Sequence, residues 1–499
     1  MGQVAKETFN GMKWMLLQKF TMRPIQLVYA MFLARLVTPT EMGILGLTSI
    51  FFAIAGQLAS CGFGSALIRK QDRTENDINT MFWFNAGMSL LMAIVLFLSA
   101  PFFVDFFNQP DLLWLTRASA LMMFINSLGN VHWTLYTARR DFKTPAIIQT
   151  VVSLISMPLC IGLAYAGWGV WSVMTQSIVG GIICIVTVWV LSPWKPSFIF
   201  SGKSFKEMFG YGSKLALSGL INTAYNNIRN LIIGKFYTPA DLAYYSRGQH
   251  LAEVIPSTIC DMLSTVTFPI LATLQNNSEK LRFIYRKYIR LFTLSITWIC
   301  LFLAAYAKPF VATMYGSQWD FAVIYVQLIA FSFAILHIHV INLNLLQVLG
   351  RTDLFLRLEI IKKILGVSVL LYCATISVIA ICIGSIILSY ACLFINSYYS
   401  KKLINMTIWQ QLMDYTPLFL LALTSTWIPA WFITDIPIWA IGQLAIGGGV
   451  SFLIYFTILY FTRNQSLRET LVIIYPKVPT SLLKKLVNHF ISNLGSAKV

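Results

Sequence analysis

Long apolar runs, repeated along the whole chain, constrain this sequence more than any other feature. A helix needs about 20 mostly apolar residues to cross a lipid bilayer, and each run has this length. Charged residues make up only 11% of the 499 residues, whereas soluble domains carry about 25%. The sequence therefore predicts an all-α integral membrane protein.

The apolar runs predict about fourteen membrane-spanning helices. Their expected limits are residues 14–37, 42–66, 80–106, 112–137, 145–166, 168–191, 207–235, 243–273, 290–313, 320–349, 355–375, 377–399, 415–433 and 437–461.

Basic residues are unevenly distributed over the connections between these spans. Of the 37 Lys and Arg residues, 28 lie in alternate connections and in the two terminal segments. The opposite connections hold five, which are Arg35, Arg117, Lys235, Arg247 and Lys308. Because Lys and Arg resist translocation, we expect the basic connections and both termini to be cytoplasmic. The net charge of +18 then reflects anchoring at the inner membrane surface, and no nucleic-acid partner is expected.

An internal repeat indicates two related halves. Residues 34–43 (ARLVTPTEMG) recur as residues 234–243 (GKFYTPADLA), each at the outer end of an odd-numbered span, and 138–141 weakly resemble 350–353. Parallel repeats predict two pseudo-symmetric six-helix lobes related by an axis along the membrane normal. The predicted parts are an N-lobe (1–206), a C-lobe (207–400), two further helices (401–461) and an amphipathic, basic cytoplasmic tail (462–499).

Charged and polar residues inside the spans are the candidate site. A charge near the bilayer centre costs at least about 2.5–3.5 kcal/mol, so it needs a polar cavity or a partner. We expect a water-filled cavity between the lobes whose cations bind an anionic group, since Lys and Arg match phosphate oxygens. The predicted cationic residues are Lys19, Arg23, Lys214 and Arg229, and the predicted polar lining is Gln26, Asn222, Tyr225, Asn226, His250, Asn342 and Asn344.

Two alternatives remain open for these residues. Arg229 or Lys214 could instead form a static buried ion pair with Glu253 or Asp261. The same two carboxylates are candidates for coupling transport to H⁺ or Na⁺, because a partly desolvated carboxylate can change protonation during a cycle. Asn342 and Asn344 fit interhelical hydrogen bonding as well as a cavity wall.

No cofactor or metal site is expected. His337 and His339 are two positions apart, which directs them about 200° apart around a helix and disfavours shared metal ligation.

Several segments resemble those of bacterial polysaccharide transporters. They are residues 34–43, 61–68 (CGFGSALI), 225–235 (YNNIRNLIIGK), 244–247 (YYSR), 342–347 (NLNLLQ) and 350–356 (GRTDLFL). Over roughly residues 1–410 the chain is similar to the O-antigen and colanic-acid (Wzx-like) flippases of the MOP exporter superfamily.

This resemblance implies a V-shaped fold of two six-helix lobes plus two helices, and transport by alternating access in the bacterial inner membrane. It implies a cargo of oligosaccharide linked to undecaprenyl pyrophosphate, moved from the cytoplasmic to the periplasmic leaflet. Membrane lipids and the polysaccharide polymerase machinery are further implied partners. The family uses basic residues in the cavity for the pyrophosphate–sugar head, and by position Lys19, Arg23, Lys214 and Arg229 are the candidates for that role here. The family often has an aromatic residue where Arg229 stands, so Arg229 is either a local specialisation or part of a structural pair.

Two other functions are alternatives to transport of a lipid-linked glycan. A drug exporter of the same superfamily would bind organic cations through acidic residues, whereas the charge in the first span is positive. A membrane-embedded polymerase or glycosyltransferase would need a long outer loop or paired catalytic carboxylates. The sequence shows neither feature, so an enzyme is not expected.

Overall fold

The computed structural model describes residues 21–22, 24–70 and 72–474, and within this part every regular element is a helix. Contacts divide the chain into unit 1 (Met1–Ala243) and unit 2 (Tyr244–Val499), which are described separately below. The predicted cations Lys19 and Arg23 and most of the predicted tail lie outside the described residues.

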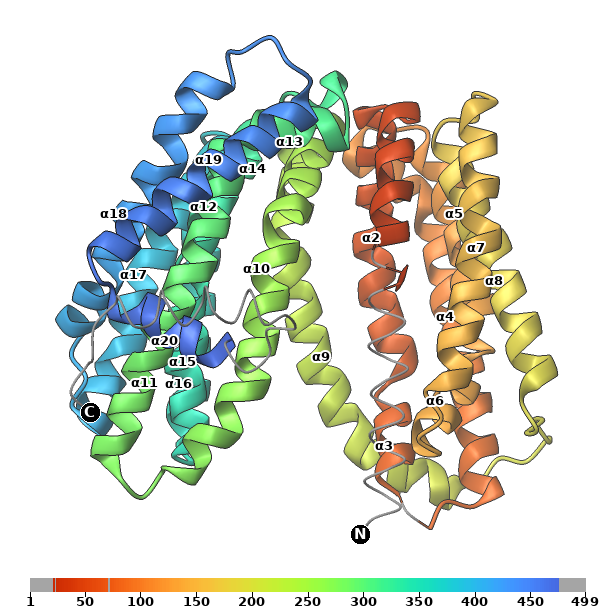
Figure 1. Cartoon of the computed structure of the whole chain (residues 1–499). Helices are drawn as coiled ribbons and strands as arrows, with labels where there is room; N and C mark the ends of the chain where they lie inside the picture. Colours follow the sequence, from red (N-terminus) through yellow and green to blue (C-terminus); the bar gives the residue numbers. More distant parts are fainter. Residues whose placement is uncertain (1–20, 23, 71, 475–499) are drawn as a thin grey trace. The chain divides into compact units, whose positions relative to one another are not determined.

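The described part of unit 1 contains the short apolar helix Pro24–Leu36 and a bundle of further helices (Figure 1). These are α2 (Pro39–Ser60), α3 (Phe63–Arg69), α4 (Glu75–Phe107), α5 (Leu112–Ser127), α6 (Asn130–Ala138), α7 (Lys143–Tyr165), α8 (Val170–Leu191) and α9 (Gly202–Phe236). Helix α2 packs against α4, α5 and α9, while α8 packs against α5 and α7.

Unit 2 contains the rest of the helices. They are α10 (Pro239–Thr273, starting in unit 1), α11 (Ser278–Phe292), α12 (Trp298–Ala305), α13 (Ala307–Met314), α14 (Ala322–Phe333), α15 (Leu336–Val348), α16 (Thr352–Ala374), α17 (Val378–Ile404), α18 (Ile408–Ile433), α19 (Ala440–Phe461) and α20 (Gln465–Ile474). A π-helical turn, Thr293–Thr297, joins α11 to α12. Helices α12, α14, α17 and α18 surround the centre of this unit.

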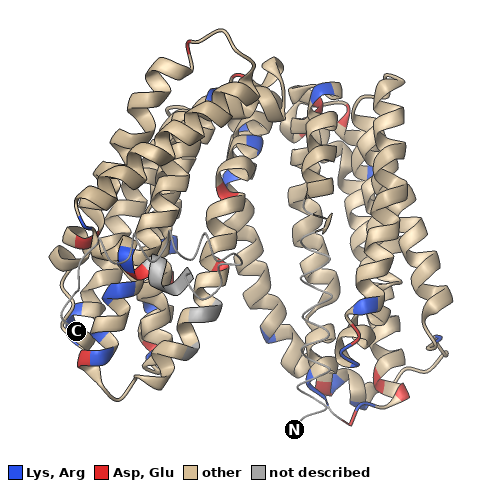
Figure 2. Ribbon diagram, viewed as in Figure 1, with Lys and Arg blue, Asp and Glu red and all other residues tan. Residues whose placement is uncertain are grey.

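Exposed apolar side chains show that the fold belongs in a membrane. Leu98, Val190, Trp431 and Phe461 are 71%, 74%, 78% and 77% exposed, which water would penalise but hydrocarbon would not. Charged residues lie mostly toward the helix ends within each unit, and the middle of most helices carries none (Figure 2).

The predicted spans and the observed helices occupy the same positions along the chain, although the predicted number of fourteen membrane-spanning helices is not confirmed. Nine helices of the described part are long and apolar enough to cross a membrane, or ten if the bent pair α5 and α6 is one span. Helices α9, α10 and α16 occupy the predicted spans 207–235, 243–273 and 355–375, but they carry more polar residues.

Several spans predicted as continuous helices are broken. The span 42–66 ends as α2 at Ser60 and restarts as α3 at Phe63, because Cys61 and Gly62 take left-handed φ angles of 44° and 70°. A bend of 40° separates α5 from α6. Hydrophobicity gives the length of a span but is insensitive to single residues that leave helical geometry.

The sequence repeat has the same local structure in both copies. Thr38 and Glu41 form a capping box at the start of α2, where the Glu41 carboxylate accepts from the Thr38 amide at 2.9 Å. At the start of α10, the Asp241 carboxylate accepts from the Thr238 amide at 3.1 Å. Reciprocal bonds of this kind satisfy amides that a helix start leaves without intrahelical partners.

The contact boundary differs from the expected lobe boundary. Helix α9, which the repeat assigns to the C-lobe, packs on α2, α3 and α4 of unit 1. The approach is very close, since a Cβ added at Gly212 would lie 2.6 Å from the carbonyl oxygen of Cys61. A contact between two helices does not show which sequence repeat each helix belongs to. The predicted boundary between the N-lobe and the C-lobe, at 206/207, therefore stays a prediction.

Connections that the charge pattern places on one side of the membrane meet at one end of unit 1. Lys70, after α3, contacts Glu207 near the start of α9. At the opposite end, Lys235 donates to the carbonyl oxygen of Phe106 at 2.5 Å. These contacts place residues 70 and 207 at one end of the unit and residues 106 and 235 at the other, while the cytoplasmic side stays a prediction.

Candidate functional site

A polar cleft lies inside unit 1, where α2, α4, α5 and α8 meet. Its volume is about 600 Å³, within the usual range of about 300–1,000 Å³ for ligand pockets. Hydroxyl and amide groups are prominent in its lining: Thr48, Ser49, Ser60, Ser89, Ser119, Asn126, Ser127, Asn130 and Ser177. All sixteen lining residues are described, and none of them is charged.

Helical spacing brings these polar residues to one face of each helix. On α2, Ser49 and Ser60 are separated by eleven positions, close to three full turns at 3.6 residues per turn. On α5, Ser119 is followed by Asn126 at i+7, which is about two turns. These spacings let one face of each of these two helices present its small polar groups to the cleft.

The hydroxyl protons of the cleft are largely used within the helices. Ser49 donates to the carbonyl oxygen of Gly46 at 2.7 Å, and Thr48 donates to that of Leu45 at 2.8 Å. Ser127 and Ser177 make the same kind of bond to Phe124 and Val173. Since a hydroxyl oxygen keeps acceptor lone pairs after donating, these groups offer acceptors, while the amides of Asn126 and Asn130 can also donate. Such a surface suits ligands rich in hydroxyl groups.

The predicted polar residues of α9 share one side of that helix. At 100° per residue, Lys214, Asn222, Tyr225, Asn226 and Arg229 fall at 0°, 80°, 20°, 120° and 60°, within a 120° arc. Lys214, Asn222 and Asn226 are exposed, and Tyr225 and Arg229 are partly buried.

A neighbouring side of α9, which overlaps the stripe, is packed against the rest of unit 1. Ser204, Met208, Gly212 and Ala216, four residues apart, are buried. On the same scale these four residues fall at 80°, 120°, 160° and 200°, so the packed side overlaps the stripe at Ser204 and Met208. The predicted stripe therefore exists as one face of α9 that adjoins the packed side.

The predicted residues of α10 are also accessible. His250 and Asp261 are exposed, while Glu253 is partly buried and accepts a hydrogen bond from Gln249 at 3.0 Å. Gln26, on the helix Pro24–Leu36, is exposed too. A cavity shared by these residues and α9 would involve both units, so the cavity, the alternative ion pairs and the ion coupling stay predictions.

Asn342 and Asn344 lie within unit 2 and make interhelical hydrogen bonds. Asn342 is 1% exposed, and its oxygen accepts from the Tyr285 hydroxyl at 2.7 Å while its amide donates to Gln411 at 3.0 Å. Asn344 accepts from Ser264 at 3.2 Å. The structure thus shows the interhelical hydrogen bonds of these residues, while their place in a cavity wall stays a prediction.

The same region of unit 2 contains a partly buried ion pair. The Asp414 carboxylate accepts from Arg286 at 2.5 and 3.0 Å, and Arg290 lies 3.7 Å away. These contacts join α11 to α18. They give the centre of unit 2 a structural polar network.

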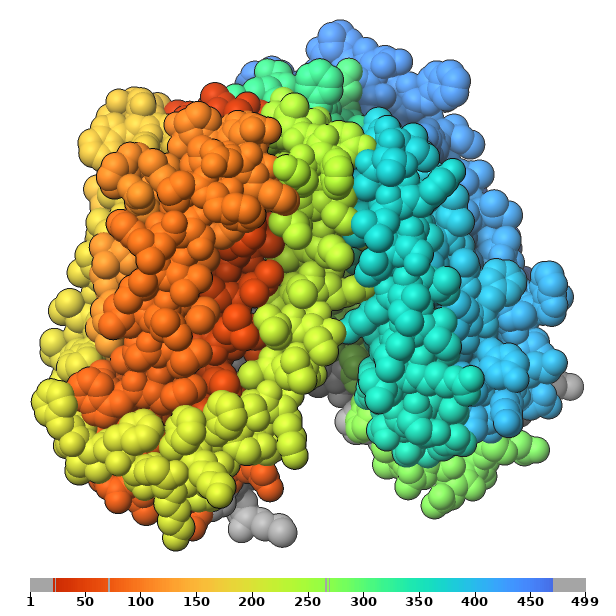
Figure 3. Space-filling view, turned by 180° about the vertical axis from the view of Figure 1, so that it is seen from behind, coloured from red at the N-terminus to blue at the C-terminus, as the bar shows by residue number. Residues whose placement is uncertain are grey.

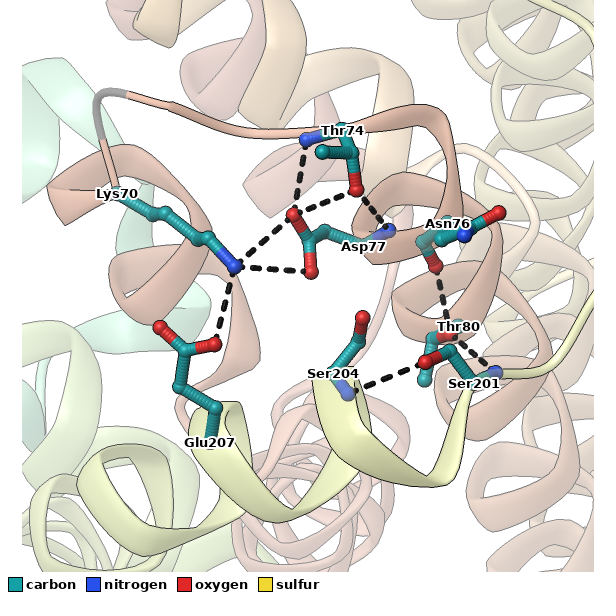
Figure 4. A network of polar contacts seen from close by, with 8 residues as sticks. All are labelled: Lys70, Thr74, Asn76, Asp77, Thr80, Ser201, Ser204 and Glu207. Atoms are coloured by element: carbon teal, nitrogen blue, oxygen red, sulfur yellow. Dashed lines mark hydrogen bonds and ion pairs between the residues drawn. The ribbon is translucent and has the colours of Figure 1, made fainter.

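A further network of hydrogen bonds and ion pairs lies at one end of unit 1 (Figure 4). Lys70 Nζ lies 3.1 Å from Asp77 Oδ2 and 3.0 Å from Glu207 Oε2. The hydrogen bond with Glu207 is the main cause that raises the pKa of Lys70. Asp77 is 1% exposed and accepts from the Thr74 amide at 2.8 Å, which caps α4. The network ties the starts of α4 and α9 to the end of α3.

Sequence reasoning missed the neutral cleft because it searched for charges inside spans. A signal was present, since Ser, Thr and Asn recur in the predicted spans 42–66 and 112–137 at spacings of about two or three helical turns. Among the described residues, no group of three or more His, Cys, Asp or Glu side chains could hold a metal ion.

Comparison with protein families shows which family the chain belongs to. The model of the family "Polysaccharide biosynthesis protein" matches residues 32–324, more than half of the chain. The chain belongs to this family. The predicted relationship to polysaccharide transporters is thus confirmed.

Individual members of the polysaccharide biosynthesis family are distant relatives. The teichuronic acid biosynthesis protein TuaB of Bacillus subtilis (strain 168) is 24% identical over 361 residues, covering 71% of this chain and 74% of that protein. The lipopolysaccharide biosynthesis protein WzxC of Escherichia coli (strain K12) is 22% identical over 330 residues, covering 65% and 66%.

Solved structures show that this polysaccharide biosynthesis protein has the fold of the MOP superfamily. The lipid II flippase MurJ in an inward closed conformation has a TM-score of 0.66 at 13% identity, covering 89% of this chain and 98% of MurJ. An inward-facing multidrug resistance MATE transporter of the MOP superfamily has a TM-score of 0.55 at 17% identity, covering 76% and 94%.

Proposed function

We propose that the protein is a flippase that carries an oligosaccharide linked to undecaprenyl pyrophosphate from the cytoplasmic to the periplasmic leaflet of the bacterial inner membrane. The observation that carries this proposal is the neutral cleft rich in hydroxyl and amide groups inside a unit whose surface is apolar. The family of polysaccharide biosynthesis proteins supports the same cargo class.

A polar passage is required because sugars and phosphates cannot cross hydrocarbon unaided. Burying one amide or hydroxyl without a hydrogen bond costs about 2–7 kcal/mol, and an isolated charge costs far more. A cleft that accepts hydrogen bonds lowers this cost for each sugar hydroxyl. The lipid tail needs no such passage and can stay in the bilayer, while alternating access moves the head group.

The two parts of the cargo head need different chemistry. In this proposal the sugars occupy the cleft of unit 1, where acceptor oxygens match their hydroxyl protons. The pyrophosphate contacts Lys214 and Arg229 on the accessible face of α9, together with Lys19 and Arg23. Glu253 and Asp261 remain the candidates for coupling to H⁺ or Na⁺.

Competing functions fit the cleft less well. A drug exporter that binds organic cations requires acidic groups, and the sixteen residues that line the cleft include none. A polymerase or glycosyltransferase requires catalytic carboxylates, which this lining also lacks. The proposal therefore describes a transporter rather than an enzyme, with cytoplasmic termini and with the polysaccharide polymerase machinery as the receiver of its cargo.

A flipping assay with purified full-length protein in vesicles tests the proposal. Wild-type protein is expected to move a fluorescent oligosaccharide on undecaprenyl pyrophosphate across the vesicle membrane. The variant Ser119→Val with Asn126→Leu removes two polar groups of the cleft. At about 1 kcal/mol for each hydrogen bond, its flipping rate is expected to fall about 30-fold.

A matched control separates this effect from general damage. Ser368 is an exposed serine of α16 that donates to the carbonyl oxygen of its own helix at 3.0 Å, so Ser368→Val should retain the wild-type rate. Full activity of the folded cleft variant would remove the cleft from the cargo path. Failure of the wild type to flip any lipid-linked glycan, with export of organic cations instead, would overturn the function itself.

A further inference from the structure

A second hollow of unit 1 is an apolar groove lined by α4, α5 and the start of α8, with a volume of about 430 Å³. Leu90, Ile94 and Phe97 of α4 form one wall, and Leu121 of α5 belongs to the other. These four side chains are exposed or partly exposed. Helices α4 and α5 form the orange face of unit 1 seen from behind (Figure 3). The groove therefore opens on an apolar surface that faces lipid.

Arg117 is the exception in this lining. The other eleven lining residues, all within the described part, are Ala, Leu, Ile, Phe or Trp. Its guanidinium carbon lies 4.9 Å from the ring centroid of Phe97 and 5.1 Å from that of Trp114. The two rings hold the cation by cation–π contact. They fix its position without neutralising its charge.

Arg117 donates no hydrogen bond to any residue that the structure describes. Its Nε is buried and has no hydrogen-bond partner, and no ion pair involves this residue within the part of the chain that the structure describes. A cation at an apolar, lipid-facing site is costly unless an anion or water meets it. The geometry thus leaves a charge complementary to a phosphate at the edge of a hydrocarbon-lined groove.

The depth of the groove matches the two parts of a phospholipid. Trp114 and Trp171 lie in the first turns of α5 and α8, as expected for tryptophans at a membrane interface. Arg117 is five residues beyond the start of α5, about 8 Å along the helix. On α4, Leu90 precedes Phe97 by seven residues, so it lies about 10 Å farther from the end of α4 that is next to the start of α5. A phosphate at Arg117 would leave a hydrocarbon chain against Ile94 and Leu90.

We propose that this groove binds one anionic phospholipid, with its phosphate at Arg117 and one acyl chain along α4 and α5. A glycan-bearing carrier is a poorer fit, because the lining offers no hydroxyl, amide or carboxylate for sugars. The groove is also distinct from the polar cleft. The same helices direct Ser89 and Ser119 to the cleft and their neighbours Leu90 and Ala118 to the groove. This inference goes beyond the proposed flippase and does not depend on it.

Native mass spectrometry of the full-length protein, titrated with phosphatidylglycerol in detergent, tests the proposal. The wild type is expected to retain one tightly bound phosphatidylglycerol. Arg117→Gln should weaken this binding about tenfold, and Arg117→Lys should weaken it less, because it keeps the charge but loses the planar fork. Lys308, exposed on α13, provides the control: Lys308→Gln also removes one cation and should leave the binding unchanged.

A second variant probes the hydrocarbon part without altering the charge. Ala118→Phe fills the groove while Arg117 remains, and it should also displace the tightly bound lipid. Wild-type lipid binding by either folded variant, Arg117→Gln or Ala118→Phe, would overturn the proposal. Preferential retention of undecaprenyl phosphate over phosphatidylglycerol in a competition would overturn it as well, since the groove would then serve the cargo carrier.

Discussion

One carboxylate in unit 1 stabilises the starts of two helices, and its removal can be predicted quantitatively. Glu41 Oε2 accepts from the Thr38 amide at 2.9 Å and from the Thr38 hydroxyl at 2.8 Å. Its other oxygen accepts from the Val170 amide at 3.2 Å, in the first turn of α8. Asp241, its counterpart in the repeat, accepts only from Thr238 in the hydrogen bonds that the structure shows.

The expected loss of stability follows from this difference. Removing a helix cap costs about 0.5–2 kcal/mol, and a negative charge at a helix N-terminus adds about 0.3–1 kcal/mol. Glu41→Ala affects two helix starts and should cost about 2 kcal/mol, whereas Asp241→Ala should cost about 1 kcal/mol. For domains of 150–250 residues, 1 kcal/mol corresponds to about 2–4 °C in Tm. The expected decreases are about 4–8 °C and about 2–4 °C.

Thermal unfolding of the purified full-length variants in one detergent, followed by tryptophan fluorescence, provides the measurement. Gly169→Ala is an independent variant, because a Cβ there would lie 1.9 Å from Glu41 Oε1 and Gly169 has a φ of 50°. It should lower Tm even though Glu41 is retained. Equal decreases for Glu41→Ala and Asp241→Ala would refute the bridging role of Glu41.

Three other changes test the packing and the polar networks. Gly212→Leu should destabilise unit 1 by about 1–3 kcal/mol through overpacking against α3, seen as a lower Tm. Asp414→Asn should cost unit 2 about 2 kcal/mol, less than a fully buried pair because Arg286 is 38% exposed. Asp77→Asn should cost about 1–2 kcal/mol, since it weakens the α4 cap and the Lys70 ion pair, and should speed amide hydrogen exchange at the start of α4. Unchanged Tm or exchange would contradict the corresponding assignment.

Hydrophobic run length was sufficient to locate most helices. The predicted span 145–166 corresponds to α7 (Lys143–Tyr165), and 168–191 corresponds to α8 (Val170–Leu191). Helix limits were less accurate where caps extend beyond the apolar core, as at the start of α4, where Thr74 caps the helix six residues before the predicted span. The break at Cys61 depends on one backbone angle, which average hydropathy does not detect.

The candidate site was only partly predictable. A charge inside a span is rare and therefore conspicuous, so the sequence singles out Lys214 and Arg229, and their common face on α9 follows from helical geometry. Their role in binding stays a prediction. Ser49 and Ser119 are individually common in membrane helices, and only the fold shows that they line the same cleft. The bonds of Asn342 to Tyr285 depend on tertiary packing, which spacing along one helix does not specify.

The hydroxyl protons of the cleft have a consequence for selectivity. An anion needs donors, but Ser49, Ser127 and Ser177 direct their protons into their own helices. A bare phosphate would therefore find donors in this cleft mainly at the amides of Asn126 and Asn130, whereas the hydroxyl protons of a neutral sugar would find acceptors at these serines. If sugars enter this cleft, as proposed above, it would favour a neutral hydroxyl-rich group over free nucleotides and inorganic phosphate without any negatively charged gate.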